Sequence, residues 1–131
     1  RQMCIRDRLL CEYLQPSLIS FETHADFIAE QFVGIAGTIP GLGRFDPCPW
    51  GLGVELRGAK DPHWTGRQNA PSTFGHFGGA GTMMWVDPSI RTGLVALTDR
   101  PFDEWSEQAI PLWSGLSDAT IEEIHAFEAA S

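Results

Sequence analysis

A glycine-rich segment at residues 73–88 constrains the fold of this chain more than any other stretch. It reads T-F-G-H-F-G-G-A-G-T-M-M-W-V-D-P, so His76 lies between glycines in one apolar run and a second apolar run follows directly. Glycines within a strand mark a close approach of another group to the backbone, and a short connection between two apolar runs is typical of a hairpin. The segment therefore predicts two neighbouring strands at residues 74–78 and 82–87.

The remaining pattern predicts an α+β fold in which helices pack on the face of an antiparallel sheet. A third strand is expected at residues 93–98, and its short connection to the second strand favours antiparallel pairing. Residues 50–56 form a further strand candidate, interrupted by glycines. Four helical segments are expected: residues 9–14, residues 21–32 behind an N-cap at Ser20, residues 103–113 ending near Pro111, and a final helix that begins at Ser117 or Asp118. Residues 34–49 and 57–72 are expected to be loops.

Length and charge exclude several classes of function. A chain of 131 residues can bury a core of its own as a single domain. Its formal net charge is −8, with eight acidic residues and one basic residue from Asp99 onward, so phosphate backbones are repelled and nucleic acid is not expected as a partner. No apolar run approaches the roughly 18 residues of a membrane helix, so no membrane span is predicted.

The cysteines, histidines and glycines do not indicate a metal or a bound cofactor. Three cysteines do not make a disulfide framework, and four scattered histidines lack the spacing of a zinc site. The glycines at residues 34–43 do not follow the G-x-G-x-x-G spacing of a dinucleotide site. His63 and Trp64 are interpreted as a surface loop anchor, with a position facing the cleft as the alternative. Glu55 and Asp87 have no spacing that would pair them, and the five tryptophans are interpreted as packing residues.

The first eight residues, R-Q-M-C-I-R-D-R, do not fit the pattern of the rest. They have no amphipathic period and no turn residues, and they resemble the translated read-through of a transposon-end sequencing adapter. We therefore expect residues 1–8 to be a non-native segment and residues 9–131 to be the protein's own. On this expectation, the natural chain extends further upstream.

Three segments follow one another in an order that resembles a known enzyme family. They are W-G-L-G at residues 50–53, F-G-H-F-G-G-A-G at 74–81 and L-V-A-L-T-D-R at 94–100. Similar segments occur in the C-terminal half of serine β-lactamases, penicillin-binding proteins and their esterase relatives, and the resemblance covers residues 20–130. It implies that residues 9–131 are the C-terminal portion of a β-lactamase/transpeptidase-like fold. It also implies a parent protein that hydrolyses a small ester or amide through an acyl-enzyme, without a cofactor.

By this resemblance, residues 76–79 form the substrate and oxyanion side of the site. His76 takes the position of the lysine or histidine in the family's third motif, and Gly78 is the motif glycine. Gly79 follows, where the family places an oxyanion-hole N–H. Phe77 stands where K-T-G enzymes have threonine, which favours esterase-like relatives over true β-lactamases.

The nucleophile and base of that family are absent from this sequence. The family's serine lies in S-x-x-K, but Lys60 is the only lysine here and no serine precedes it by three positions. The second motif, Y-x-N or Y-x-S, is not matched by Tyr13-Leu14-Gln15, so Tyr13 is interpreted as a packing residue. We therefore expect no catalytic nucleophile or base in this chain, no metal, and no activity from the chain alone.

Two other interpretations stay open at this level. The chain could be a small non-catalytic binding or interaction domain with a coincidental H-x-G, or a family member that has lost catalysis. No targeting signal is visible, which leaves the compartment open, the cytoplasm included.

Overall fold

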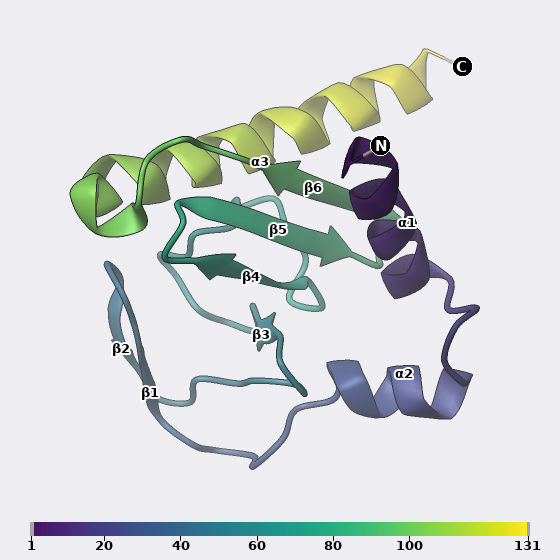
Figure 1. The fold of residues 1–131 in the computed structure, drawn as a ribbon, viewed down its shortest axis with the longest axis horizontal. Coiled ribbons are helices and arrows are strands. Elements are labelled where there is room, and N and C mark those ends of the chain that lie inside the picture. The colour runs from purple at the N-terminus through teal and green to yellow at the C-terminus, as the bar shows by residue number, and fades with distance from the viewer. Residues whose placement is uncertain (1, 131) are drawn as a thin grey trace.

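The computed structural model describes the backbone of residues 2–130 and the side chains of residues 5–130. Helices combine with antiparallel sheets in an α+β fold (Figure 1), as the sequence predicts. In chain order the elements are α1 (Gln2–Leu14), α2 (Phe21–Ile28), β1 (Gly37–Ile39), β2 (Gly43–Phe45), β3 (Glu55–Leu56), β4 (Phe74–Gly78), β5 (Thr82–Asp87), β6 (Thr92–Ala96), the 3-10 helix η1 (Phe102–Glu104) and α3 (Ser106–Ala129).

The main sheet has the strand order β3-β4-β5-β6, with every neighbouring pair antiparallel. The hairpin of β4 and β5 has the predicted bounds and pairs His76 with Met84 and Gly78 with Thr82. Its turn is closed by Gly81 N–H, which donates to the Gly78 carbonyl at 2.9 Å. Gly81 has a φ of +75°, and an added Cβ would overlap the Arg100 carbonyl oxygen, so this position requires glycine.

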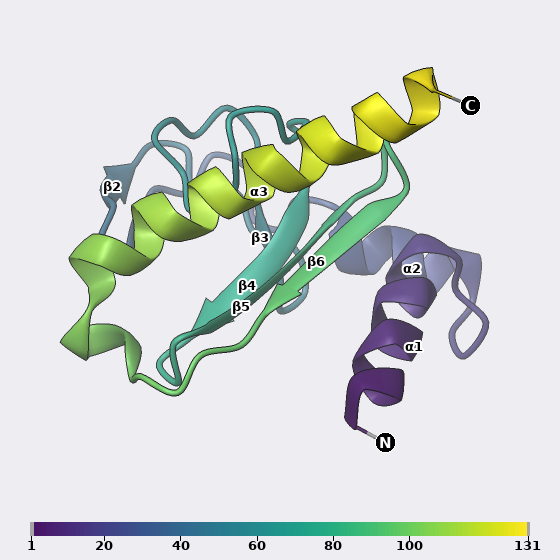
Figure 2. The same ribbon diagram turned by 90° about the horizontal axis from the view of Figure 1, so that it is seen from above.

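Helices cover both faces of the main sheet. Figure 2 shows α3 along one face, with α1 and α2 on the other side. Because side chains alternate along a strand, the two faces build two cores. The α3 side holds a cluster that includes Met83, Trp85, Trp105, Trp113 and Ile121. The α1 and α2 side holds Val54, Phe74 and Val86, against which Leu10, Tyr13 and Phe27 pack.

Tyr13 has the packing role that the sequence indicates. Its ring stacks on Phe27 at a centroid distance of 5.5 Å and meets the edge of Phe74 at 5.8 Å. The side chain therefore joins both N-terminal helices to the first long strand of the main sheet.

The prediction of two C-terminal helices is wrong, because α3 is continuous from Ser106 to Ala129. Pro111 lies inside it: the proline ring suits the helical φ and costs one backbone donor without ending the helix. Ser117 is not an N-cap but a fully buried link between helix and sheet. Its hydroxyl accepts from Trp85 Nε1 at 2.9 Å and donates to the Trp113 carbonyl at 2.7 Å.

Several predicted bounds also change in the N-terminal half. Ser20 is the N-cap of α2, as predicted, and its Oγ accepts from Thr23 N–H at 3.1 Å. The helix ends at Ile28 instead of Phe32, because Ala29 is extended and Phe32 adopts a φ of 54°. The predicted loop 34–49 contains the hairpin of β1 and β2, and the strand candidate 50–56 is reduced to β3. The last strand is shifted to Thr92–Ala96.

The segment interpreted as non-native is helical where it is described. Helix α1 begins at Gln2 and runs without interruption across residues 8 and 9 to Leu14, while Arg1 lies outside the described residues. The non-native origin of residues 1–8 stays a prediction. Among residues 2–130, no helix combines the length and apolar character needed to cross a bilayer.

Replacing Ser117 with alanine is expected to destabilise the fold by about 1–3 kcal/mol, because Trp85 Nε1 would be left buried without an acceptor. Chemical denaturation measures the change. Thr120 is the matched control, since its hydroxyl also bonds the carbonyl four residues back (Leu116, 2.8 Å) but at the surface. Equal losses for Ser117→Ala and Thr120→Ala would contradict the proposed link to the sheet.

Candidate functional site

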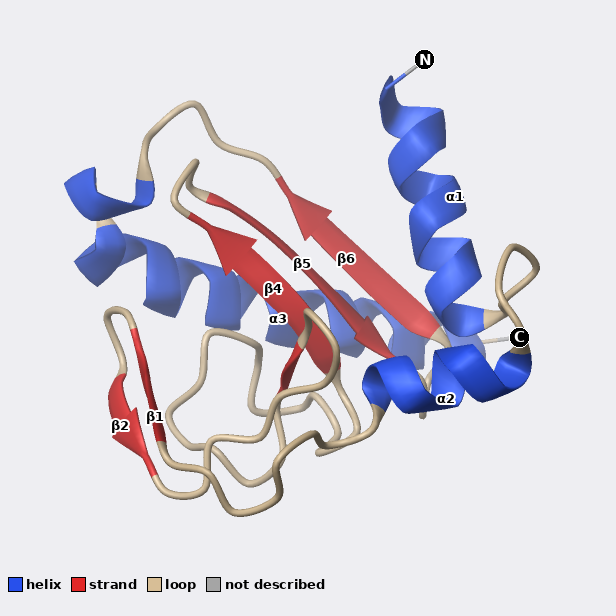
Figure 3. Cartoon of the chain, turned by 60° about the horizontal axis from the view of Figure 1, so that its bottom comes forward, coloured by secondary structure: helices blue, strands red, loops and turns tan. Residues whose placement is uncertain are grey.

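The edge of β4 is open beside the H-x-G segment. Strand β3 pairs only with Phe74 and Gly75, so within residues 2–130 no strand lies along His76–Gly78 on that side. Figure 1 shows β3 as a short segment next to β4, and Figure 3 shows the β1 and β2 hairpin apart from the main sheet. A cavity of about 310 Å³ occupies this place. Its walls are Thr38, Ile39, Pro40, Trp50, Glu55, His76, Phe77, Gly78, Gly79 and Phe102.

All four predicted site residues therefore line one cavity, and they do so in different ways. His76 is exposed, and its ring meets the edge of Trp50 at a centroid distance of 5.6 Å. Phe77 is half-buried and packs into the α3-side core, with its ring 4.9 Å from Phe102 and 5.7 Å from Trp113. Phe77 is thus both a wall of the cavity and part of the core beneath it.

The glycines of this segment fall into two kinds. An added Cβ at Gly75 would overlap the Met84 carbonyl oxygen, so that glycine is needed for pairing within the sheet. At Gly78 and Gly79 an added Cβ would meet nothing within 4 Å. The fold does not require glycine at these two positions, and their missing side chains leave clearance at the cavity.

Gly79 is held in place by its carbonyl, which accepts from Phe102 N–H at 2.9 Å. Among residues 2–130, no backbone acceptor pairs with the Gly79 N–H. A fixed, unpaired N–H next to open space can donate a hydrogen bond to a ligand.

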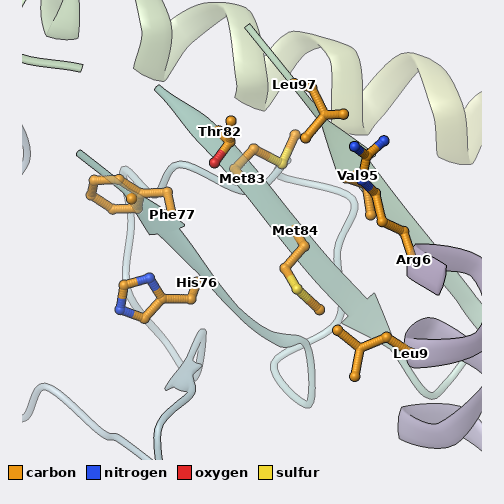
Figure 4. Close-up of a pocket in the computed structure, with 10 residues that line it drawn as sticks. Arg6, Leu9, His76, Phe77, Thr82, Met83, Met84, Val95 and Leu97 are labelled. Atoms are coloured by element: carbon orange, nitrogen blue, oxygen red, sulfur yellow. The ribbon is translucent and has the colours of Figure 1, made fainter. Parts of the chain in front are cut away.

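A second cavity, of about 330 Å³, lies between the sheet and α1. Figure 4 shows Met84, Val95, Leu9 and Arg6 around it, together with His76 and Phe77. One of its walls, Arg6, belongs to the segment interpreted as non-native. Gly79 does not line this second cavity, whereas all four residues at positions 76–79 line the cavity at the β4 edge.

The floor of the β4-edge cavity is a buried polar cluster around Glu55. Its Oε1 lies 2.7 Å from Lys60 Nζ and 2.7 Å from His63 Nε2, and its Oε2 accepts from Trp64 Nε1 at 2.8 Å. The Glu55 and Lys60 side chains are each 2% exposed, and among the described residues Glu55 is the sole partner of that ammonium. The interpretation of His63 and Trp64 as a surface anchor is wrong, because both are buried.

Opposing effects set the pKa values in this cluster. Burial would raise the pKa of Glu55, but the hydrogen bond from His63 and the Lys60 charge outweigh it, so that pKa lies below its usual 4.5. Burial lowers the pKa of His63 below its usual 6.5, against the hydrogen bond to Glu55 that raises it. Since Thr65 N–H donates to Nδ1 at 3.2 Å, the neutral ring carries its proton on Nε2, facing Glu55. Lys60 is therefore the cation that balances Glu55 at neutral pH.

Sequence reasoning missed this cluster. The cluster spans only ten positions of the sequence and consists of Glu55, Lys60, His63 and Trp64. The one available signal was the single lysine of the chain, in a loop that shows no other motif.

Asp87 forms a separate polar anchor: it accepts from Ala70 N–H at 2.8 Å and from Ser89. Glu55 and Asp87 therefore do not act as paired carboxylates.

Replacing Glu55 with glutamine is expected to destabilise the protein by about 3–5 kcal/mol, because the buried Lys60 ammonium would lose its counter-charge. Denaturant unfolding measures the loss. Asp46→Asn is the matched control, since it breaks the exposed Arg44–Asp46 pair of 3.6 Å and should cost at most about 1 kcal/mol. A Glu55→Gln protein as stable as the control would contradict the assignment of a buried ion pair.

The free energy of unfolding is expected to fall as the pH drops below about 6.5. His63 has a lower pKa in the folded state than its usual 6.5, so the unfolded state binds more protons in this range. The lowered pKa values of Glu55 and Asp87 extend the loss below their usual 4.5 and 3.8. Unfolding curves of wild type and His63→Gln from about pH 7.5 to pH 5 test the first part. The variant should show a shallower slope, whereas His125→Gln, on the exposed side of α3, should keep the wild-type slope.

The described side chains contain no group of three or more histidines, cysteines or carboxylates placed to hold a metal ion. The β4-edge cavity presents a strand edge, two glycines, a histidine and aromatic side chains.

Comparison with known proteins identifies the family. The beta-lactamase family model matches residues 11–113, so the chain belongs to the β-lactamase family, which has a serine-hydrolase type of fold. A crystal structure of a β-lactamase from Mycobacterium bovis is similar, with 46% sequence identity and a TM-score of 0.82 over 88% of this chain. This chain spans 42% of the length of that protein. No curated protein gives a match.

Proposed function

We propose that this chain supplies one wall of the active site of a serine hydrolase that cleaves a small ester or amide. The observation that carries the proposal is the open edge of β4 at His76–Gly79, where two glycines leave clearance that the fold itself does not need. In this proposal the substrate lies along that edge, with its carbonyl oxygen at the Gly79 N–H.

The proposed reaction is two-step acyl transfer. A serine oxygen adds to the substrate carbonyl carbon, the alcohol or amine leaves with a proton, and water then releases the acid and restores the serine. Negative charge develops on the carbonyl oxygen in each step, and a preorganised N–H stabilises it because it needs no reorganisation. The hydrogen bond between Gly79 O and Phe102 N–H supports this role, since it fixes the peptide next to the donor.

The nucleophile is proposed to lie outside this sequence. No serine here precedes a lysine by three positions, and the sole lysine is buried against Glu55. The similar β-lactamase is more than twice as long as the matched segment, since 42% of it is covered. In this proposal His76 is a substrate-side group, and the chain alone is inactive.

The test is a chimera in which this chain replaces the matching segment of the M. bovis β-lactamase. The chimera should hydrolyse p-nitrophenyl acetate, and the 131-residue chain alone should not. Gly79→Ala in the chimera should lower kcat/KM by roughly 100-fold, because the added methyl displaces the carbonyl from the N–H.

Gly115→Ala is the matched control, because an added Cβ there also meets nothing within 4 Å. Gly115 is an exposed residue of α3. It should leave kcat/KM unchanged. An active Gly79→Ala chimera would contradict the role of the β4 edge. Turnover by the chain alone that is lost in His76→Ala would contradict a nucleophile outside this sequence.

A further inference from the structure

The β4-edge cavity offers a ligand almost no free charge. Its walls are mainly apolar or aromatic, and among the described residues no arginine or lysine lines it. The two ionisable residues in its lining are Glu55 and His76. A carboxylate placed here would therefore find no fixed cation, and burying an unpaired charge is costly.

Glu55 does not act as a free anion in the cavity. Both of its oxygens are engaged by Lys60, His63 and Trp64, at 2.7–2.8 Å, and the residue is 2% exposed. The Lys60 ammonium, which does not line the cavity, balances the charge of Glu55. A cationic ligand would therefore gain little attraction from this carboxylate. A ligand carboxylate would gain no cation from this pair either, because Lys60 is bound to Glu55 and does not line the cavity.

The aromatic walls define what the cavity can hold. Trp50 is 36% exposed at one side, Phe77 and Phe102 form another with rings 4.9 Å apart, and Ile39 and Pro40 of the small hairpin close a third. The volume of about 310 Å³ lies at the lower end of the roughly 300–1,000 Å³ of small-molecule sites, which suits a single ring or a short acyl chain.

From these features we infer that the β4-edge cavity binds the uncharged, apolar acyl group of the substrate, such as an arylacetyl or short branched acyl group, and excludes acyl groups that carry a carboxylate. The inference rests on the proposed function, because it assigns the acyl side of the same site. Trp50 and Phe102 are the specificity-determining walls, and the lack of an arginine or lysine among the described lining residues sets the exclusion of carboxylates.

The test uses the full chain and two probes of the same shape, phenylacetamide and phenylacetate. Binding is followed by the shifts of the Trp50 indole N–H and the Gly79 amide in ¹H–¹⁵N spectra. Phenylacetamide should shift both signals with a millimolar Kd, as befits so small a ligand. Phenylacetate should bind at least about tenfold more weakly, because its charge has no partner.

Three variants sharpen the result. Trp50→Ala should weaken phenylacetamide at least about fivefold, read from the Gly79 amide, because it removes an aromatic wall. Leu52→Ala, which alters an exposed apolar side chain outside the lining, should leave the affinity unchanged. Thr38→Arg adds a cation at an exposed wall position and should bring phenylacetate to at least the affinity of phenylacetamide.

Each outcome bears on one idea only. Equal binding of the two probes, absence of binding by both, or shifts that spare Trp50 and Gly79 would overturn the assignment of the cavity. Selective binding of phenylacetamide together with an inactive chimera would leave the cavity assignment standing and refute the proposed function. An active chimera whose chain binds phenylacetate as well as phenylacetamide would refute the acyl-group inference alone.

Discussion

The buried carboxylate of Glu55 is the constraint on which the rest of the site depends. A charge that is 2% exposed must be paired, and its partners Lys60, His63 and Trp64 all come from the loop that follows β3. Satisfying one carboxylate thus ties that loop to β3, and Trp64 joins the α3-side core. The chain leaves the strand after Leu56, and the edge of β4 beyond Gly75 stays uncovered.

Strand β4 has two different pairing environments along its length. At Phe74 and Gly75 it is an internal strand, paired on both sides, and Gly75 lies so close to β5 that no side chain fits. From His76 onward it is an edge strand, and Gly78 and the following Gly79 have room around them. Sheet pairing therefore explains one glycine and leaves Gly78 and Gly79 unexplained by packing. That contrast is the physical basis of the proposed site.

Charge balance and apolar walls act together in the cavity. The Lys60–Glu55 ion pair carries no net charge. Glu55 is the member of the pair that lines the cavity. Phe77 joins the cavity to the α3-side core, where Trp113 and the Trp85–Ser117 hydrogen bond hold the helix to the sheet. The position of the cavity wall is therefore tied to the packing of the C-terminal helix.

Local patterns in the sequence determined the hairpin at residues 74–87, the N-cap at Ser20, the packing of Tyr13 and the family, because each depends on neighbouring residues or on an ordered set of motifs. Tertiary structure alone decided the rest. Pro111 and Ser117 look like a helix break until the sheet buries Ser117 against Trp85. Glu55, Lys60, His63 and Trp64 show no period, since their meeting depends on the loop folding back against β3. Long-range burial, which no local pattern encodes, is the physical reason that the charged floor and the open strand edge emerge only in the folded chain.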